Sequence, residues 1–66
     1  MKLELRLLWA FSDGDRWVTL ATGSCSKALE EMERMAEIEM QKPHWGNYSF
    51  GVQVLKDGKI YSEFEI

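Results

Sequence analysis

The chain contains one cysteine, one proline and one histidine among 66 residues, and it has no long apolar run. A single cysteine excludes an internal disulfide and is typical of a reducing compartment, so we expect a cytoplasmic protein. No segment approaches the roughly 20 apolar residues that a membrane-spanning helix needs, and no signal-peptide pattern is present. We therefore expect no membrane among the partners.

Basic residues are also few, because eight lysines and arginines stand against eleven aspartates and glutamates, a formal net charge of −3. This balance argues against nucleic acid as a partner, since such binding relies on a basic surface. The glycine spacing of phosphate-binding and dinucleotide-binding loops is missing. Asp13, Asp15 and His44 match no metal-binding spacing and are interpreted as turn formers. We expect no cofactor, no metal and no catalytic residue.

The length predicts one domain covering residues 1–66 with one small core. At this size only about 60% of the unfolded chain's surface is buried on folding. A pocket of about 300 Å³ with its supporting residues has little room in such a chain, so an enzyme is not expected. A partner or a second copy would add to its stability.

Ser24–Lys42 is the only segment with a helical period, and it divides the chain into two halves. Ser24 or Ser26 is expected to cap its first turn, and Pro43 to end it. Glu39 projects into the apolar stripe, which we interpret as a frayed last turn from which Glu39 reaches solvent. The apolar stripe of this helix consists of Cys25, Ala28, Leu29, Met32, Met35, Ala36 and Met40.

The first half predicts a β-hairpin, because residues 1–11 alternate with Leu3, Leu5, Leu7, Trp9 and Phe11 on one face. Asp13-Gly14 is typical of a two-residue type I′ turn. A turn there pairs Trp9 with Val18 and Leu7 with Leu20, and it places Trp17 opposite Ala10 on the other face.

The second half predicts another hairpin, in which Tyr48, Phe50, Val52 and Val54 point inward. We expect a three-residue turn with Gly58 in the left-handed bulge position. That turn pairs Val54 with Ile60 and Phe50 with Phe64, all on one face. A two-residue turn would set Val52 opposite Glu63 and is rejected for that reason.

The predicted fold is α+β, in the order ββαββ, with one helix on one face of a four-stranded sheet. A right-handed crossover is the default for the helical connection. The predicted strand order is 2-1-4-3, which brings Lys2 and Arg6 near Glu63 and Glu65. This arrangement is similar to the β-grasp architecture of ubiquitin-like and immunoglobulin-binding domains. The similarity concerns element order alone, and no functional residue is assigned from it.

The topology predicts two ends with different chemistry. The turn at residues 13–15 and the helix exit loop at residues 43–47 share one end, whereas the helix N-terminus and the turn at residues 56–59 share the other. The second end holds hydroxyls and lysines, but serine and glycine are what any helix start uses, so no anion site is assigned. Cys25 belongs to the apolar stripe and is interpreted as a buried structural residue, far from the histidine.

Tryptophan beside arginine in a turn-borne polar rim is typical of protein-binding hot spots. Trp17 should lie on the sheet face that lacks a helix, and Trp45 either adds to this surface or folds down over the core. The primary hypothesis is a non-enzymatic protein-binding module, a regulator or inhibitor of a larger protein, or a homodimer. Its candidate contact residues are Leu8, Ala10, Arg16, Trp17, Trp45 and Tyr61.

Two alternatives remain open. Trp17 and Tyr61 could stack bases on the sheet of a nucleic-acid or nucleotide binder. Alternatively, the acidic ridge Glu30, Glu33 and Glu37 on the exposed helix side could mimic nucleic-acid phosphates in an inhibitor. The simpler interpretation of the ridge is a solvated helix face, in which Glu30 and Arg34 form an i,i+4 pair.

Overall fold

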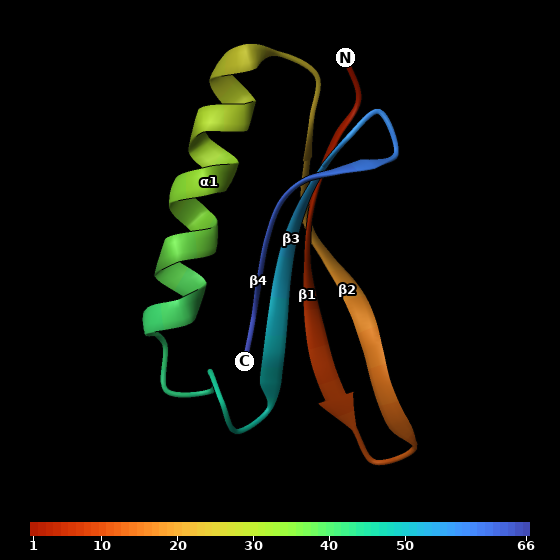
Figure 1. Ribbon diagram of the computed structural model, residues 1–66, viewed down its shortest axis with the longest axis vertical. Coiled ribbons are helices and arrows are strands. Elements are labelled where there is room, and N and C mark those ends of the chain that lie inside the picture. Colours follow the sequence, from red (N-terminus) through yellow and green to blue (C-terminus); the bar gives the residue numbers. More distant parts are fainter.

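Two strands, one helix and two further strands follow one another in the computed structural model, which describes residues 1–66. The four strands form one antiparallel sheet and the helix packs on one of its faces, a small compact α+β domain (Figure 1). The elements are β1 (Leu3–Phe11), β2 (Gly14–Gly23), α1 (Ser26–Gln41), β3 (Ser49–Lys56) and β4 (Lys59–Glu65).

The sheet has the order β2-β1-β3-β4, so the predicted order 2-1-4-3 and its β-grasp-like arrangement are wrong. β1 pairs with β3 in the centre, and β4 is an edge strand. The burial of the two strands gives the reason. β3 is buried along nearly its whole length, on both faces, whereas β4 carries charged residues and is exposed almost throughout. A strand with charged side chains suits an edge, where water reaches it.

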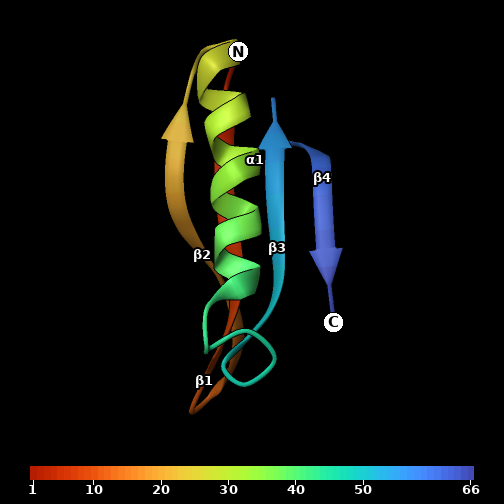
Figure 2. The ribbon, with the colours of Figure 1, turned by 90° about the vertical axis from the view of Figure 1, so that its left-hand side faces the viewer.

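The helical connection from β2 to β3 passes in front of β1 and is right-handed, as expected (Figure 2). The helix lies over β1 between β2 and β3, and it contacts these three strands. β4 lies to the side and is not covered (Figure 2). An α-helix with its side chains is about 10 Å wide and strands are about 4.8 Å apart, so one helix covers about two strands.

The hydrophobic core lies between the helix and the two central strands. Its half-buried surroundings include Trp9, Ala21 and Trp45. Phe11 and Tyr48 were predicted to point inward, but both are exposed because they lie beyond the end of the helix. The buried apolar residues of the core are Leu3, Leu5, Leu7, Met32, Ala36, Val52 and Val54.

Gly23 allows the helix to approach the end of β2. A Cβ atom at this position would lie 2.6 Å from the Ala28 Cβ and 3.4 Å from the Met32 Cε. Atoms at 2.6 Å overlap, so any larger residue would push the first turn of the helix away from the sheet.

The first hairpin turns one residue earlier than predicted. Phe11 pairs with Gly14, and Leu7 pairs with Val18 instead of Leu20. Asp13 does not have a positive φ, so the predicted type I′ turn is wrong, although Gly14 has φ +130°. A bulge then displaces Leu20, which is exposed. Between the turn and the bulge the pairing is shifted by two residues, which leaves those side chains on their predicted faces. Beyond the bulge the shift is one residue, so Ala21 lies opposite Leu5 and packs against the core.

The second hairpin has the turn that was rejected from the sequence. Asp57 and Gly58 form a two-residue turn with φ values of 52° and 80°, the signs of a type I′ turn. A bulge at Tyr61 then shifts the register, so Val52 lies opposite Phe64 rather than Glu63. A two-residue turn without a bulge would pair the inward Val52 with the charged Glu63, and for that reason it was rejected. The bulge shifts the pairing by one residue and removes this mismatch.

The helix begins two residues later than predicted, with Cys25 as its N-cap residue and no side-chain cap hydrogen bond. Cys25 is exposed, so its interpretation as a buried structural residue is wrong. Cys25 is exposed because it precedes the N-terminus of the helix, whose buried residues, Met32 and Ala36, lie further along the chain. The predicted grouping of loops is confirmed: the first turn and the helix exit loop share one end of the domain (Figure 1).

Candidate functional site

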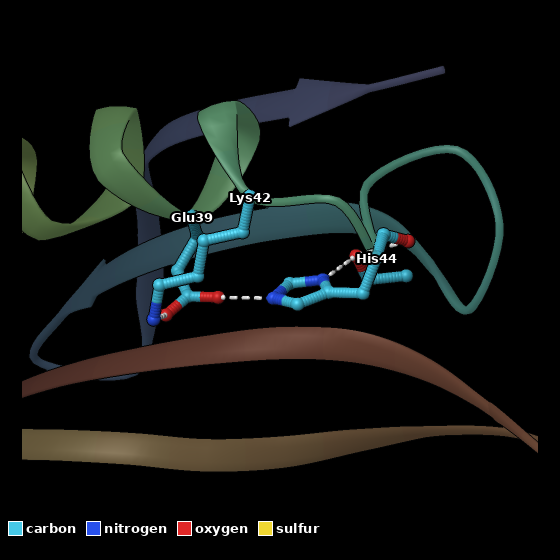
Figure 3. A network of polar contacts seen from close by, with 4 residues as sticks. Glu39, Lys42 and His44 are labelled. Carbon is cyan, nitrogen blue, oxygen red and sulfur yellow. Dashed lines mark hydrogen bonds and ion pairs between the residues drawn. The ribbon is translucent and has the colours of Figure 1, made fainter.

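A polar cluster joins the end of the helix to the start of β3 (Figure 3). His44 Nε2 lies 3.0 Å from Glu39 Oε2, and His44 Nδ1 lies 2.6 Å from the Ser49 hydroxyl oxygen. Lys42 Nζ donates to Glu39 Oε1 at 2.7 Å. Glu39 does not reach into solvent from a frayed turn, because its side chain is only 13% exposed. The frayed-turn interpretation was therefore wrong.

Serine, histidine and carboxylate in a hydrogen-bonded series are the groups of a hydrolase triad, but this series is built for structure. Ser49 is fully buried, so its hydroxyl cannot meet a substrate. The backbone N–H groups of Asn47, Tyr48 and Ser49 all donate to the His44 carbonyl, and so does the Ser49 hydroxyl at 3.3 Å. The cluster folds the exit loop around His44.

Aromatic rings close this end of the domain. The Trp9 ring lies 5.0 Å from the His44 ring and 6.2 Å from the Tyr48 ring, centroid to centroid. Trp45 is half-buried and packs against the core. Of its two interpretations, the geometry fits the one in which Trp45 covers the open end of the core.

The sheet face without a helix is crossed by a chain of polar contacts. Arg6 Nε donates to Gln53 Oε1 at 2.8 Å, and Gln53 Nε2 donates to Glu63. The predicted strand order set Arg6 directly beside Glu63 and Glu65 of the last strand. In the structure Gln53 lies between Arg6 and Glu63. Glu4 accepts from the Thr19 hydroxyl at 2.5 Å on the same face.

Trp17 lies flat within this network. The Arg6 guanidinium is 4.6 Å from its ring centroid, a cation–π distance. A Cβ atom at Gly51 would be 3.4 Å from the Trp17 ring and 3.5 Å from Leu8, so the indole spans from β2 over β1 to β3. Trp17 is half-buried by this arrangement and covers part of the face that has no helix.

The predicted contact residues divide into three groups. Leu8, Ala10 and Trp17 share the helix-free face. Arg16 pairs with Trp9 in register, which puts it on the helix side, and its guanidinium lies 4.1 Å from the Phe11 ring centroid at the hairpin tip. Trp45 is also on the helix side, and Tyr61 lies on the edge strand, 49% exposed.

A second apolar surface runs along β4. Of its residues, only Tyr61 was predicted from the sequence to be a contact residue. We call it the β4 edge surface. Phe64 was predicted to pack inside with Phe50, but no helix lies over β4, so it is exposed. The width of a single helix was the signal that could have identified this surface. Its exposed residues are Ile60, Tyr61, Phe64 and Ile66.

The remaining candidates have weaker geometry. Glu30, Glu33 and Glu37 are exposed on the helix, and the predicted Glu30–Arg34 pair does not form: the three ion pairs lie elsewhere. A hollow of about 680 Å³, larger than the pocket of about 300 Å³ for which the sequence left little room, lies at the opposite end from His44. One lysine, Lys2, and two carboxylates line it, so its charge does not select an anion. No group of three metal-ligating side chains is present.

Comparison of the chain with protein-family models, with curated proteins and with solved structures finds no match. No helix in the structure is both long and apolar enough to cross a bilayer.

Proposed function

We propose that this chain is a small, non-enzymatic protein-binding module that regulates or inhibits a larger protein in the cytoplasm. One observation carries the proposal. The β4 edge surface exposes three large apolar side chains on a strand whose outer edge has no partner, and a fourth, Ile66, directly after it; Tyr61 and Ile60 are about half exposed, at 49% and 56%. Ile60 lies on the helix-free face opposite Leu55 and Phe64 on the helix side opposite Val52, so the apolar residues surround the open edge of the strand. Exposed large apolar residues around an unpaired strand edge are typical of interaction sites.

The helix-free face supports the same proposal. Trp17 and Leu8 lie on it beside the polar rim of Arg6, Gln53 and Glu63. Aromatic residues surrounded by polar groups are enriched in the centres of protein interfaces. Because Trp17 is already half-buried by its neighbours, we assign the larger share of the contact to β4.

The same features argue against the other functions. The side chains of Glu4 and Glu63 lie on the face of Trp17 and would repel the phosphates of a nucleic acid. In the serine–histidine–glutamate series the serine is fully buried and has no access to a substrate. The unpaired Cys25 is compatible with a reducing cytoplasm.

Affinity capture from an extract of the source cells tests this function. The wild-type protein is compared with the double variant Tyr61→Ser, Phe64→Ser and with the helix variant Glu33→Gln, each checked for folding by circular dichroism. We expect a protein that is retained by the wild type and by Glu33→Gln, and depleted about tenfold or more by the double variant, since central aromatic residues carry much of the binding energy. A protein set that is identical for all three would contradict the proposal.

A further inference from the structure

The two edges of the sheet differ in how well they could accept another strand. β2 is interrupted near its middle by the bulge at Leu20, and its exposed residues include Thr19 and Thr22. Bulges and polar side chains protect an edge from pairing. β4 has its bulge at Tyr61, close to the turn, which leaves Ser62–Glu65 in regular pairing with β3 and open on the other side.

The open stretch of β4 has two faces of different chemistry. Ser62 and Phe64 pair with the core residues Val54 and Val52, so they lie on the helix side. Phe64, 44% exposed, is the apolar residue of this stretch on the helix side. Glu63 and Glu65 lie on the other face, both exposed, and neither forms an ion pair within the chain.

We propose that β4 binds an extended segment of another protein by strand addition, and that this segment alternates apolar and basic residues. The inference rests on the proposed function and specifies its partner. An added strand shares the pleat of β4, so its alternate side chains fall on the same two faces. Apolar side chains then pack on Phe64, and lysine or arginine side chains lie opposite Glu63 and Glu65.

A second copy of this chain fits the same edge poorly. In a symmetric antiparallel pair of two β4 strands, one residue, the centre, lies opposite its own copy. A centre at Glu63, Phe64 or Glu65 sets glutamate opposite glutamate, which is destabilising. A centre at Ser62 pairs Lys59 with Glu65 but runs through the bulge at Tyr61, which breaks the ladder. The edge therefore favours a different, basic partner over self-association.

Titration of the isotope-labelled protein with the capped peptide Val-Lys-Val-Arg-Val-Lys-Val, followed by amide chemical shifts, tests this inference. The acidic peptide Val-Glu-Val-Asp-Val-Glu-Val is the matched control probe. We expect the basic peptide to shift amides along Ile60–Ile66 and to bind more weakly as salt is added. The variant Glu65→Lys should lower its affinity about fivefold, whereas Glu37→Lys, the same charge change on the helix, should change it less than about twofold.

Four results would overturn strand addition at β4. Three of them are equal binding of the acidic peptide, a lack of shifts at any accessible peptide concentration, and a dimer by light scattering that occupies β4. Shifts confined to the residues around Trp17 would also overturn it, but they would leave the proposed protein-binding function in place. Failure of that function is detected separately, by affinity capture that shows no protein dependent on Tyr61 and Phe64.

Discussion

At the scale of single residues, Gly23 is the position where the fold tolerates least change. Because Gly23 has no side chain, Ala28 packs directly against its backbone. A Cβ atom added at Gly23 would lie only 2.6 Å from the Ala28 Cβ. We expect Gly23→Ala to lower the free energy of unfolding by about 1–3 kcal/mol, because the helix must move away from β2. Urea denaturation measures the change.

The matched control for Gly23 is Gly51→Ala. A Cβ atom at Gly51 meets its nearest neighbour, the Trp17 ring, at 3.4 Å, an ordinary contact. We expect a change below about 1 kcal/mol there, since a gain in chain stiffness offsets a small adjustment of the ring. Equal losses at the two glycines would contradict the close helix packing at Gly23.

Ser49 is the second residue with a specific prediction. Its buried hydroxyl bonds to His44 Nδ1 at 2.6 Å, so Ser49→Ala leaves that ring nitrogen without a partner. We expect a loss of about 1–2 kcal/mol in unfolding free energy. Ser62→Ala removes a half-buried hydroxyl on β4 and should cost less than about 0.5 kcal/mol. A smaller loss at Ser49 than at Ser62 would contradict the role of the cluster.

Glu39 shows what the sequence contained about this cluster and what it did not. The helical period placed Glu39 correctly on the apolar stripe, and a carboxylate on that side needs a partner when buried. The partner, His44, follows the helix in an irregular loop. Because no periodicity describes such a loop, its contact with Glu39 was not predictable from pattern alone.

At the scale of elements, neither Asp-Gly pair forms the turn predicted for it: the first hairpin turns at Ser12-Asp13, between the paired residues Phe11 and Gly14. Asp57-Gly58 forms the type I′ turn that was expected at Asp13-Gly14. The alternation of apolar residues was a correct guide to faces along Leu3–Leu7 and at Val52 and Val54, but it failed at Leu20 and Ile60. It failed on register because the first hairpin turns one residue earlier than predicted and because each hairpin contains a bulge, at Leu20 and at Tyr61. A bulge changes the pairing by one residue without any signal in a period of two.

The turn assignment predicts unequal effects at the two aspartates. Asp57 has φ 52°, and its carboxylate accepts from the Lys2 backbone N–H at 2.8 Å. We expect Asp57→Ala to cost about 1–2 kcal/mol of unfolding free energy, from left-handed strain and the lost hydrogen bond. Asp13→Ala removes only an exposed contact with Arg16 and should cost less than about 0.5 kcal/mol. The reverse ranking, measured by thermal denaturation, would contradict the observed turns.

The start of the helix offers a stabilising substitution. Cys25 occupies the N-cap position in an extended conformation without a side-chain cap hydrogen bond, and the first turn has no acidic residue. Cys25→Asp should raise the free energy of unfolding by about 0.5–1 kcal/mol, because its carboxylate accepts an orphan N–H and favours the helix dipole. The control Cys25→Ala should give no gain. Equal stability of the two variants would show that the helix starts elsewhere.

The strand order was the largest error in the predicted fold, and it was avoidable in part. The order 2-1-4-3 rested on pairing Lys2 and Arg6 with the acids of the last strand, a weak surface term. The stretch Val52–Leu55 is buried on both faces, the requirement for a central strand, whereas Glu63 and Glu65 require an edge. Burial outweighs surface charge pairing at this size.

At the scale of the whole molecule, one helix covers too little of a four-stranded sheet. Sequence reasoning identified the uncovered sheet face and Trp17, but it treated β4 as a covered central strand. With β4 at the edge, its residue Phe64 and the following Ile66 are exposed, and the candidate contact area moves from Trp17 toward the edge. Protein binding remains a proposal, and its main contact surface is now β4 instead of the helix-free face around Trp17.

Site-specific photo-crosslinking in the source cells tests the central claim most directly. A photoreactive amino acid replaces Tyr61 in one variant and Glu33, on the exposed helix, in a matched control. The account predicts a covalent adduct with another protein from position 61 and none from position 33, since the partner lies along β4. Adducts from position 33 alone, or equal adducts from both positions, would contradict the assignment of β4 as the contact surface.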